Sequence, residues 1–189
     1  MEEQELKQYK AKKMMLWVGM ISMAMTFAGL TSAYVVSSSR ADWLSQFKIP
    51  GSFTISTLFI LLSSFSFYLA KKSLLSKNIK ATKILILTTF MLALLFVYFQ
   101  FRGFADIIAQ GYYFTGAESS ITTSFLYVLV LLHLAHLFAG IIALLVVYFR
   151  LVTGSYSGSN TLGFELAHLF WHFLDILWIY LYLFVLLYR

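Results

Sequence analysis

Residues 163–189 read GFELAHLFWHFLDILWIYLYLFVLLYR and decide the fold. The stretch is apolar enough to lie in lipid, yet it carries Glu165, His168, His172 and Asp175. Because a helix turns by about 100° per residue, these four side chains fall within an arc of roughly 80°. An ionisable group at bilayer depth costs about 2.5–3.5 kcal/mol on insertion scales, so this polar stripe needs a protein or water surface to face.

The composition of the whole chain is that of an integral membrane protein. Of its 189 residues, 60% are hydrophobic, 19% are aromatic and only 12% are charged, and the mean hydropathy is +0.81. A soluble domain could not cover so much apolar side chain with so little charge. The formal charge of +6 comes from short Lys and Arg clusters between apolar runs, so we expect no nucleic-acid partner. The chain has no cysteine, which excludes disulfides and thiolate metal sites.

Five segments are long enough to cross a hydrocarbon core of about 30 Å. We therefore predict an all-α integral membrane protein, an antiparallel bundle of five transmembrane helices that forms a single membrane domain over residues 1–189. With the N-terminus inside, ten of the fourteen Lys and Arg residues lie on the inner side, against Arg40, Lys48, Arg102 and Arg189 outside. This bias predicts an N-in, C-out topology. The predicted helices lie near 14–37, 53–70, 81–101, 121–149 and 162–188.

The fourth segment offers a partner for the polar stripe. His133, His136 and Gly140 are spaced 3 and 4 residues apart, so they share one side of the helix. A Gly/Ser/Asn-rich turn connects this segment to the last one, which predicts an antiparallel hairpin. At 1.5 Å per residue, His136 and Asp175 lie at similar heights in that hairpin. We predict that the two polar faces meet and that imidazole bridges to carboxylate.

Several kinds of chemistry could use such a polar face. Haem is not favoured, because the histidines within each helix lie at nearly one depth. A di-iron bundle needs two Glu-x-x-His pairs and two further Glu, whereas this chain has only Glu165-x-x-His168. A proton path along the stripe remains open, as does a fully paired structural network. We favour the network, since no repeat or broken helix suggests a transporter, and we expect no catalytic residue, cofactor or metal in this chain.

The first segment carries a seam of small residues. Gly19, Ser22, Thr26, Gly29 and Ala33 are spaced 3, 4, 3 and 4 residues apart, which places them along one line of a helix. Small side chains let two helix backbones approach closely in lipid. We favour packing of this seam inside the subunit over a seam for a partner protein.

The C-terminal half resembles a known family. Gly163-Phe164-Glu165 followed by Trp171-His172-Phe173-x-Asp175-x-x-Trp178 looks like the last helix of subunit III of haem-copper oxidases. His133-x-x-His136-x-x-x-Gly140 resembles the helix before it, and Tyr113-Phe114-Thr115-Gly116 resembles the loop before that helix. The resemblance is strong from about residue 98 to the end, and before that it rests on helix count, order and orientation. Many relatives have seven spans, and this chain is similar to the short five-helix bacterial form. The Ser-Glu step that the family often has is replaced by Ser22-Met23.

The resemblance implies an accessory subunit III of cytochrome c oxidase in a bacterial cytoplasmic (inner) membrane. Such a subunit docks on catalytic subunit I, with subunit II in the same complex, and supports aerobic electron transport and proton uptake without a redox centre of its own. Haem and copper would belong to the partner subunits, and phospholipid would lie in the clefts. A quinol oxidase subunit and a nitric oxide reductase accessory protein remain alternatives, and a stand-alone transporter is the alternative from another class. The electron donor, the haem type and membership of a respiratory supercomplex stay open.

Overall fold

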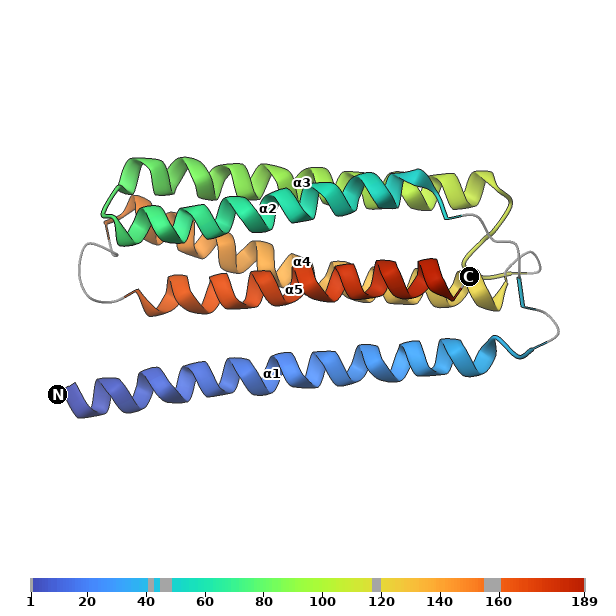
Figure 1. Ribbon diagram of the computed structural model, residues 1–189, viewed down its shortest axis with the longest axis horizontal. Helices are drawn as coiled ribbons and strands as arrows, with labels where there is room; N and C mark the ends of the chain where they lie inside the picture. Colours follow the sequence, from blue (N-terminus) through green and yellow to red (C-terminus); the bar gives the residue numbers. More distant parts are fainter. Residues whose placement is uncertain (1, 41–42, 45–48, 117–119, 155–160, 189) are drawn as a thin grey trace.

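The computed structural model describes residues 2–40, 43–44, 49–116, 120–154 and 161–188. All five of its helices are long and apolar enough to cross a membrane, which confirms the predicted all-α membrane fold. The helices run antiparallel to their neighbours along the chain (Figure 1). They are α1 (Glu2–Ser37), α2 (Gly51–Leu75), α3 (Ile79–Ala109), α4 (Ile121–Val152) and α5 (Leu162–Leu187).

Two of the helices extend well past the predicted ends. α1 has 36 residues and is therefore about 54 Å long, whereas a hydrocarbon core measures about 30 Å. The residues ahead of Met14 are mostly Glu, Gln, Lys, Leu and Ala, which are good helix formers, so the helix continues beyond the apolar run. α3 continues to Ala109, and the Asn78 side chain caps its other end by accepting a hydrogen bond from the Ala81 N–H.

The helices pack as a connected bundle in which α1 is the least buried helix. α2 and α3 form a tight hairpin, joined by a short turn in which Lys77 adopts a left-handed φ of 58°. α2 also packs on α5, α4 packs on α3 and α5, and α1 touches only α4 and α5 among the described residues. Figure 1 shows α1 along the side of the bundle opposite α2 and α3.

The two ends of the bundle are distinct. The N-terminus, the α2–α3 turn and the start of α5 lie at one end, and the end of α5 lies at the other (Figure 1). This arrangement is the one that the predicted topology needs, although which end faces the cytoplasm stays a prediction. Lys48 and Arg189, which entered that prediction, lie outside the described residues, as does most of the turn between α4 and α5.

Two glycines allow close helix contacts. A Cβ atom on Gly103 of α3 would lie 2.8 Å from two ring carbons of Phe53 on α2. A Cβ atom on Gly140 of α4 would lie 2.8 Å from Cδ1 of Leu174 and 3.4 Å from the ring of Trp171, both on α5. In each pair, the two helices are therefore closer together than a larger residue at the glycine position would allow without a shift of the neighbouring side chains.

Candidate functional site

The two histidines of the polar stripe on α5 face α2 and not α4. His172 Nδ1 lies 2.6 Å from the Ser64 hydroxyl oxygen of α2, and His172 Nε2 lies 3.0 Å from Nε2 of His168. The two imidazole rings meet edge to face, with centroids 4.2 Å apart. One imidazole nitrogen donates and the other accepts in the neutral ring, so this row of three groups can be satisfied with both histidines neutral.

Glu165 links the stripe to α1. Its Oε2 accepts a hydrogen bond of 2.7 Å from the Tyr9 hydroxyl, and its Oε1 accepts one of 3.3 Å from the Thr161 hydroxyl. Tyr9 lies in the part of α1 that precedes the predicted first span. The early start of α1 is thus what places a partner beside this carboxylate, and a prediction that began the helix at Met14 had no means of finding it.

Asp175 is the most deeply buried member of the stripe. Its side chain is 2% exposed, and neither carboxylate oxygen has a hydrogen-bond partner among the described residues. The nearest cationic candidate is Nδ1 of His172 at 3.9 Å, which is too far for a hydrogen bond. Burying an ionised carboxylate without such partners is costly.

The two histidines of α4 do not reach the acids of α5. His133 is fully buried, its ring centroid lies 5.1 Å from that of Trp178, and neither of its nitrogens has a hydrogen-bond partner among the described residues. His136 Nδ1 lies 2.8 Å from the Leu132 carbonyl oxygen of its own helix. The predicted bridge from imidazole to carboxylate between these two helices is therefore absent from the described structure.

The rotation of α5 explains why the predicted pairing does not form. α4 meets α5 through Leu174, Trp171 and Trp178. At about 100° per residue, the centre of that face lies roughly 100° around the helix from the centre of the polar stripe. Spacing on one helix fixes which residues share a face, but it does not say which neighbour covers that face.

Hydroxyl groups of α2 are the partners that sequence reasoning missed. Trp171 Nε1 donates to the Ser63 hydroxyl oxygen at 3.1 Å, and Trp178 Nε1 donates to Thr57 Oγ1 at 3.0 Å. Together with Ser64, these hydroxyls form a row that receives the polar atoms of α5. A buried indole N–H needs an acceptor, so tryptophans beside a polar stripe were a usable signal for a hydroxyl-bearing neighbour.

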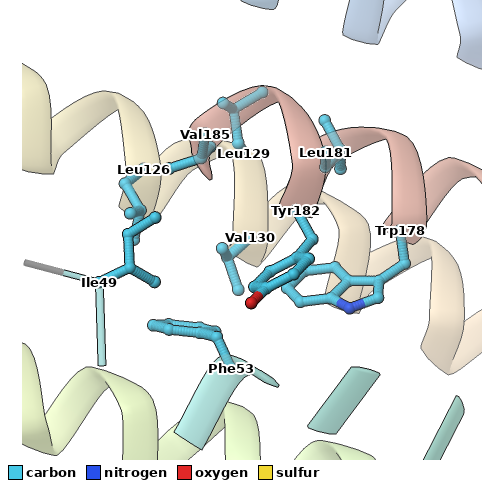
Figure 2. Close-up of a pocket in the computed structure, with 9 residues that line it drawn as sticks. All are labelled: Ile49, Phe53, Leu126, Leu129, Val130, Trp178, Leu181, Tyr182 and Val185. Carbon is cyan, nitrogen blue, oxygen red and sulfur yellow. The ribbon is translucent and has the colours of Figure 1, made fainter. Parts of the chain in front are cut away.

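An apolar hollow lies next to this row (Figure 2). Figure 2 shows Phe53 of α2 just below Val130 of α4, with the rings of Tyr182 and Trp178 of α5 beside them. The Tyr182 hydroxyl lies 2.8 Å from Thr54 Oγ1, so the polar tips at the hollow are already engaged. The hollow therefore suits hydrocarbon better than a reacting group. Its other lining residues are Ile49, Leu126, Leu129, Val130, Leu181 and Val185.

The small-residue seam of α1 faces away from the bundle. Ser22, Thr26, Gly29 and Ala33 are exposed, and Gly19 is half-buried. A Cβ atom added to either glycine would meet nothing within 4 Å. The packing inside the subunit that the sequence favoured therefore does not occur among the described residues. α1 instead packs through another face, which carries Met20, Phe27, Thr31 and Tyr34.

The described residues hold no group of three or more His, Cys, Asp or Glu side chains that could bind a metal ion. His168 and His172 approach each other, and Lys71 lines the same hollow as His168, but an ammonium group cannot be a ligand for a cation.

The comparisons with known proteins agree on one family. The family model described as "Cytochrome c oxidase subunit III" matches residues 9–189. The chain is 30% identical to "Cytochrome bo(3) ubiquinol oxidase subunit 3" of Buchnera aphidicola subsp. Acyrthosiphon pisum, over 90% of this chain and 83% of that protein. It is 30% identical to "Cytochrome c oxidase subunit 3" of Alkalihalophilus pseudofirmus, over 83% of this chain and 73% of that protein. The chain belongs to the cytochrome c oxidase subunit III family.

Proposed function

We propose that the chain is the accessory third subunit of a respiratory haem-copper terminal oxidase in a bacterial cytoplasmic membrane. The family match over residues 9–189 carries this proposal, because it extends into all five helices. The chain docks on catalytic subunit I, with subunit II in the same complex. Haem and copper are held by those partners, and this chain supports electron transport and proton uptake without a redox centre of its own.

The polar network acts as a structural element in this proposal. Glu165 is hydrogen-bonded to α1, and His172 is hydrogen-bonded to α2, so the stripe joins three helices. Hydrogen bonds between transmembrane helices contribute on the order of 0.5–2 kcal/mol each. His133 and His136 pack against aromatic rings instead of joining the stripe. A relay remains the alternative, since Ser64, His172 and His168 form a row along which a proton could pass.

The outward seam of α1 supports a helix of the catalytic subunit as its partner. α1 is the least buried of the five helices, and its small residues face outward. Lipid gives no reason for glycines to be aligned on an exposed face, whereas a second helix can pack closely on them. The membrane lipid then covers the remaining apolar surface of the bundle.

The electron donor of the complex has two candidates. Cytochrome c is the donor in the leading proposal. Quinol is the second candidate, because relatives from Buchnera aphidicola and Pseudomonas aeruginosa carry the name of a ubiquinol oxidase subunit. A copper-binding domain in subunit II would favour cytochrome c, and its absence would favour quinol.

Purification of the tagged full-length chain from its native membrane tests this function. We expect haem-copper subunits in stoichiometric amounts and a haem spectrum that disappears when the chain is separated from them. A preparation without haem-copper subunits would contradict the proposal, and a Soret band on the separated chain would contradict the absence of a redox centre. Solute transport by liposomes that contain this chain alone would favour the transporter alternative.

A further inference from the structure

The two halves of α1 are held to the bundle differently. In the half that follows Gly19, four side chains are at most 3% exposed, and they are Met20, Phe27, Thr31 and Tyr34. The side chains of residues 6–19 are all described, and none of them is buried. Figure 1 shows the α1 ribbon diverging from α5 towards the N-terminus. The bundle therefore anchors α1 from Met20 onward, whereas residues 6–19, which we call the N-terminal segment, stand away from it.

A hydrogen bond joins the N-terminal segment to α5. The Tyr9 hydroxyl donates to Oε2 of Glu165 over 2.7 Å. A polar hollow lies beside this bond, and its lining comes from α1, α2 and α5. Tyr9 and Lys13 are its α1 residues, so the N-terminal segment forms one wall of the hollow. The other lining residues are Lys71 of α2 and Leu162, Glu165, Leu166, His168 and Leu169 of α5.

Gly19 lies where the N-terminal segment meets the anchored part of α1. The next residue, Met20, is 2% exposed and is the first buried side chain of α1 among those that the structure describes. A Cβ atom on Gly19 would meet nothing within 4 Å, so no close contact inside the subunit requires a glycine here. Glycine is the weakest helix former after proline, and hinge positions are often small residues. The helix is therefore easiest to bend at the point where its contacts with the bundle end.

The charges that line the hollow act in opposite directions on the N-terminal segment. The Glu165 carboxylate attracts Lys13 of α1, whereas the ammonium group of Lys71 on α2 repels it. Lys13 Nζ lies 5.9 Å from the centroid of the Tyr9 ring, so Tyr9 and Lys13 move together if the segment swings outward. Because attraction and repulsion partly cancel, the hydrogen bond from Tyr9 carries much of what holds the segment in place.

We propose that the N-terminal segment of α1 is a lid on the polar hollow, hinged at Gly19 and held closed by the hydrogen bond from Tyr9 to Glu165. In the closed position the segment covers one side of Glu165 and His168. In the open position water reaches His168, which is the first group of the row that continues through His172 to Ser64. The lid is built from this chain alone and does not depend on docking to an oxidase, so the two proposals fail separately.

Distances between spin labels on the full-length chain in lipid nanodiscs test the lid. The chain has no cysteine, so labels attach only to introduced ones. The first pair, Lys10→Cys with Ser76→Cys, joins the N-terminal segment to the turn after α2 at two exposed positions. The second pair, Val36→Cys with Ile108→Cys, joins the anchored half of α1 to the far end of α3, also at exposed positions. The first pair reports on opening of the lid, and the second reports on detachment of the whole helix.

Three substitutions are compared in both labelled backgrounds. Tyr9→Phe removes the hydroxyl and keeps the ring. Its matched control is Tyr68→Phe, which removes the hydroxyl of an exposed tyrosine of α2 that does not line the hollow. Gly19→Ala, combined with Tyr9→Phe, stiffens the hinge because alanine is the better helix former. The melting temperature of each protein is recorded as a check on folding.

We expect Tyr9→Phe to increase the population at long distances in the first pair by about threefold or more, since a hydrogen bond between transmembrane helices changes an equilibrium by a factor of roughly 3–30. The second pair and the Tyr68→Phe control should match the wild type, and adding Gly19→Ala should reverse part of the increase. An unchanged first pair would overturn the proposal, as would an equal increase in the control. An increase in both pairs would overturn it as well, because the whole of α1 would then detach, and a Gly19→Ala change without effect would remove the hinge.

Water access to the hollow gives a second measurement. Leu166 lines the hollow, so Leu166→Cys can be labelled with a membrane-impermeant maleimide in the otherwise cysteine-free chain. We expect labelling to be about threefold faster or more when Tyr9→Phe is added, in step with the larger open population. Equal labelling rates with and without the Tyr9 hydroxyl would show that the segment does not control access, and would overturn its role as a lid.

Discussion

The hydroxyl oxygen of Ser64 on α2 lies 2.6 Å from Nδ1 of His172 on α5. The contact continues to His168, whose Nε2 lies 3.0 Å from Nε2 of His172. With both rings neutral, Ser64 can donate to His172 and His172 to His168, or every donor and acceptor can be reversed. The two imidazoles are thus satisfied by a hydroxyl, and no carboxylate has to approach them.

Replacing Ser64 by alanine should weaken the contact between α2 and α5. His172 is only 25% exposed, so its Nδ1 would lose a partner that water replaces poorly. We expect the free energy of unfolding in detergent to fall by about 0.5–1.5 kcal/mol. Thr88→Ala is the control, since the Thr88 hydroxyl is exposed and bonds to the Ile84 carbonyl of its own helix. Equal stability of the two variants would show that the Ser64 contact contributes nothing measurable.

Gly103→Ala should destabilise the pair α2 and α3. The new methyl group would lie 2.8 Å from the Phe53 ring, which is buried and cannot rotate away freely. We expect a loss of about 1–3 kcal/mol in the free energy of unfolding. The control is Gly19→Ala, where nothing lies within 4 Å and alanine is the better helix former, so stability should stay equal or rise. An unchanged free energy of unfolding for Gly103→Ala would mean that the two helices can move apart at little cost.

The fold followed from the sequence because length and hydropathy suffice to identify five spans, and the structure has five such helices. The stripe on α5 also followed, since spacing fixes which residues share a helix face. The helix that contacts this stripe could not be predicted from the sequence. It depends on how far α5 is rotated, and that rotation is set by contacts such as Leu174 against Gly140 and Trp178 against Thr57. A sequence does not show whether a serine or threonine hydroxyl bonds to its own helix or to a neighbouring one. The row of hydroxyl groups on α2 could therefore not be predicted.

The Asp175→Asn substitution tests whether the Asp175 carboxylate is bridged to a histidine. If the carboxylate were bridged to a histidine, its loss would cost roughly 1–2 kcal/mol. In the structure its oxygens lack hydrogen-bond partners among the described residues, so we expect the unfolding free energy to stay within about 1 kcal/mol of the wild type, or to rise. Chemical unfolding of the purified chain measures this. A large loss would reveal a partner for Asp175. Unchanged stability with an altered pH dependence of oxygen turnover in the complex would favour the relay over the structural network.

A substitution on the exposed face of α1 can show whether a protein partner or lipid covers that face. Gly29 lies on the outward seam, and a side chain added there meets nothing within the subunit. We expect Gly29→Ile to leave the melting temperature of the isolated chain nearly unchanged, because isoleucine suits a lipid-facing helix surface.

In the complex the same change should act differently. A bulky side chain would hold a partner helix away from the seam, and we expect recovery of the catalytic subunit with the tagged chain to fall at least tenfold, which corresponds to about 1.4 kcal/mol of lost affinity. The control is Ala28→Ile. Ala28 is also exposed and adjacent in sequence, but it lies roughly 140° around the helix from the centre of the seam. If both variants recover the catalytic subunit as well as the wild type does, the seam faces lipid and the docking surface lies elsewhere. A loss with both would point to a general defect of α1 insertion, and only the loss with Gly29→Ile alone supports a helix packed on the seam.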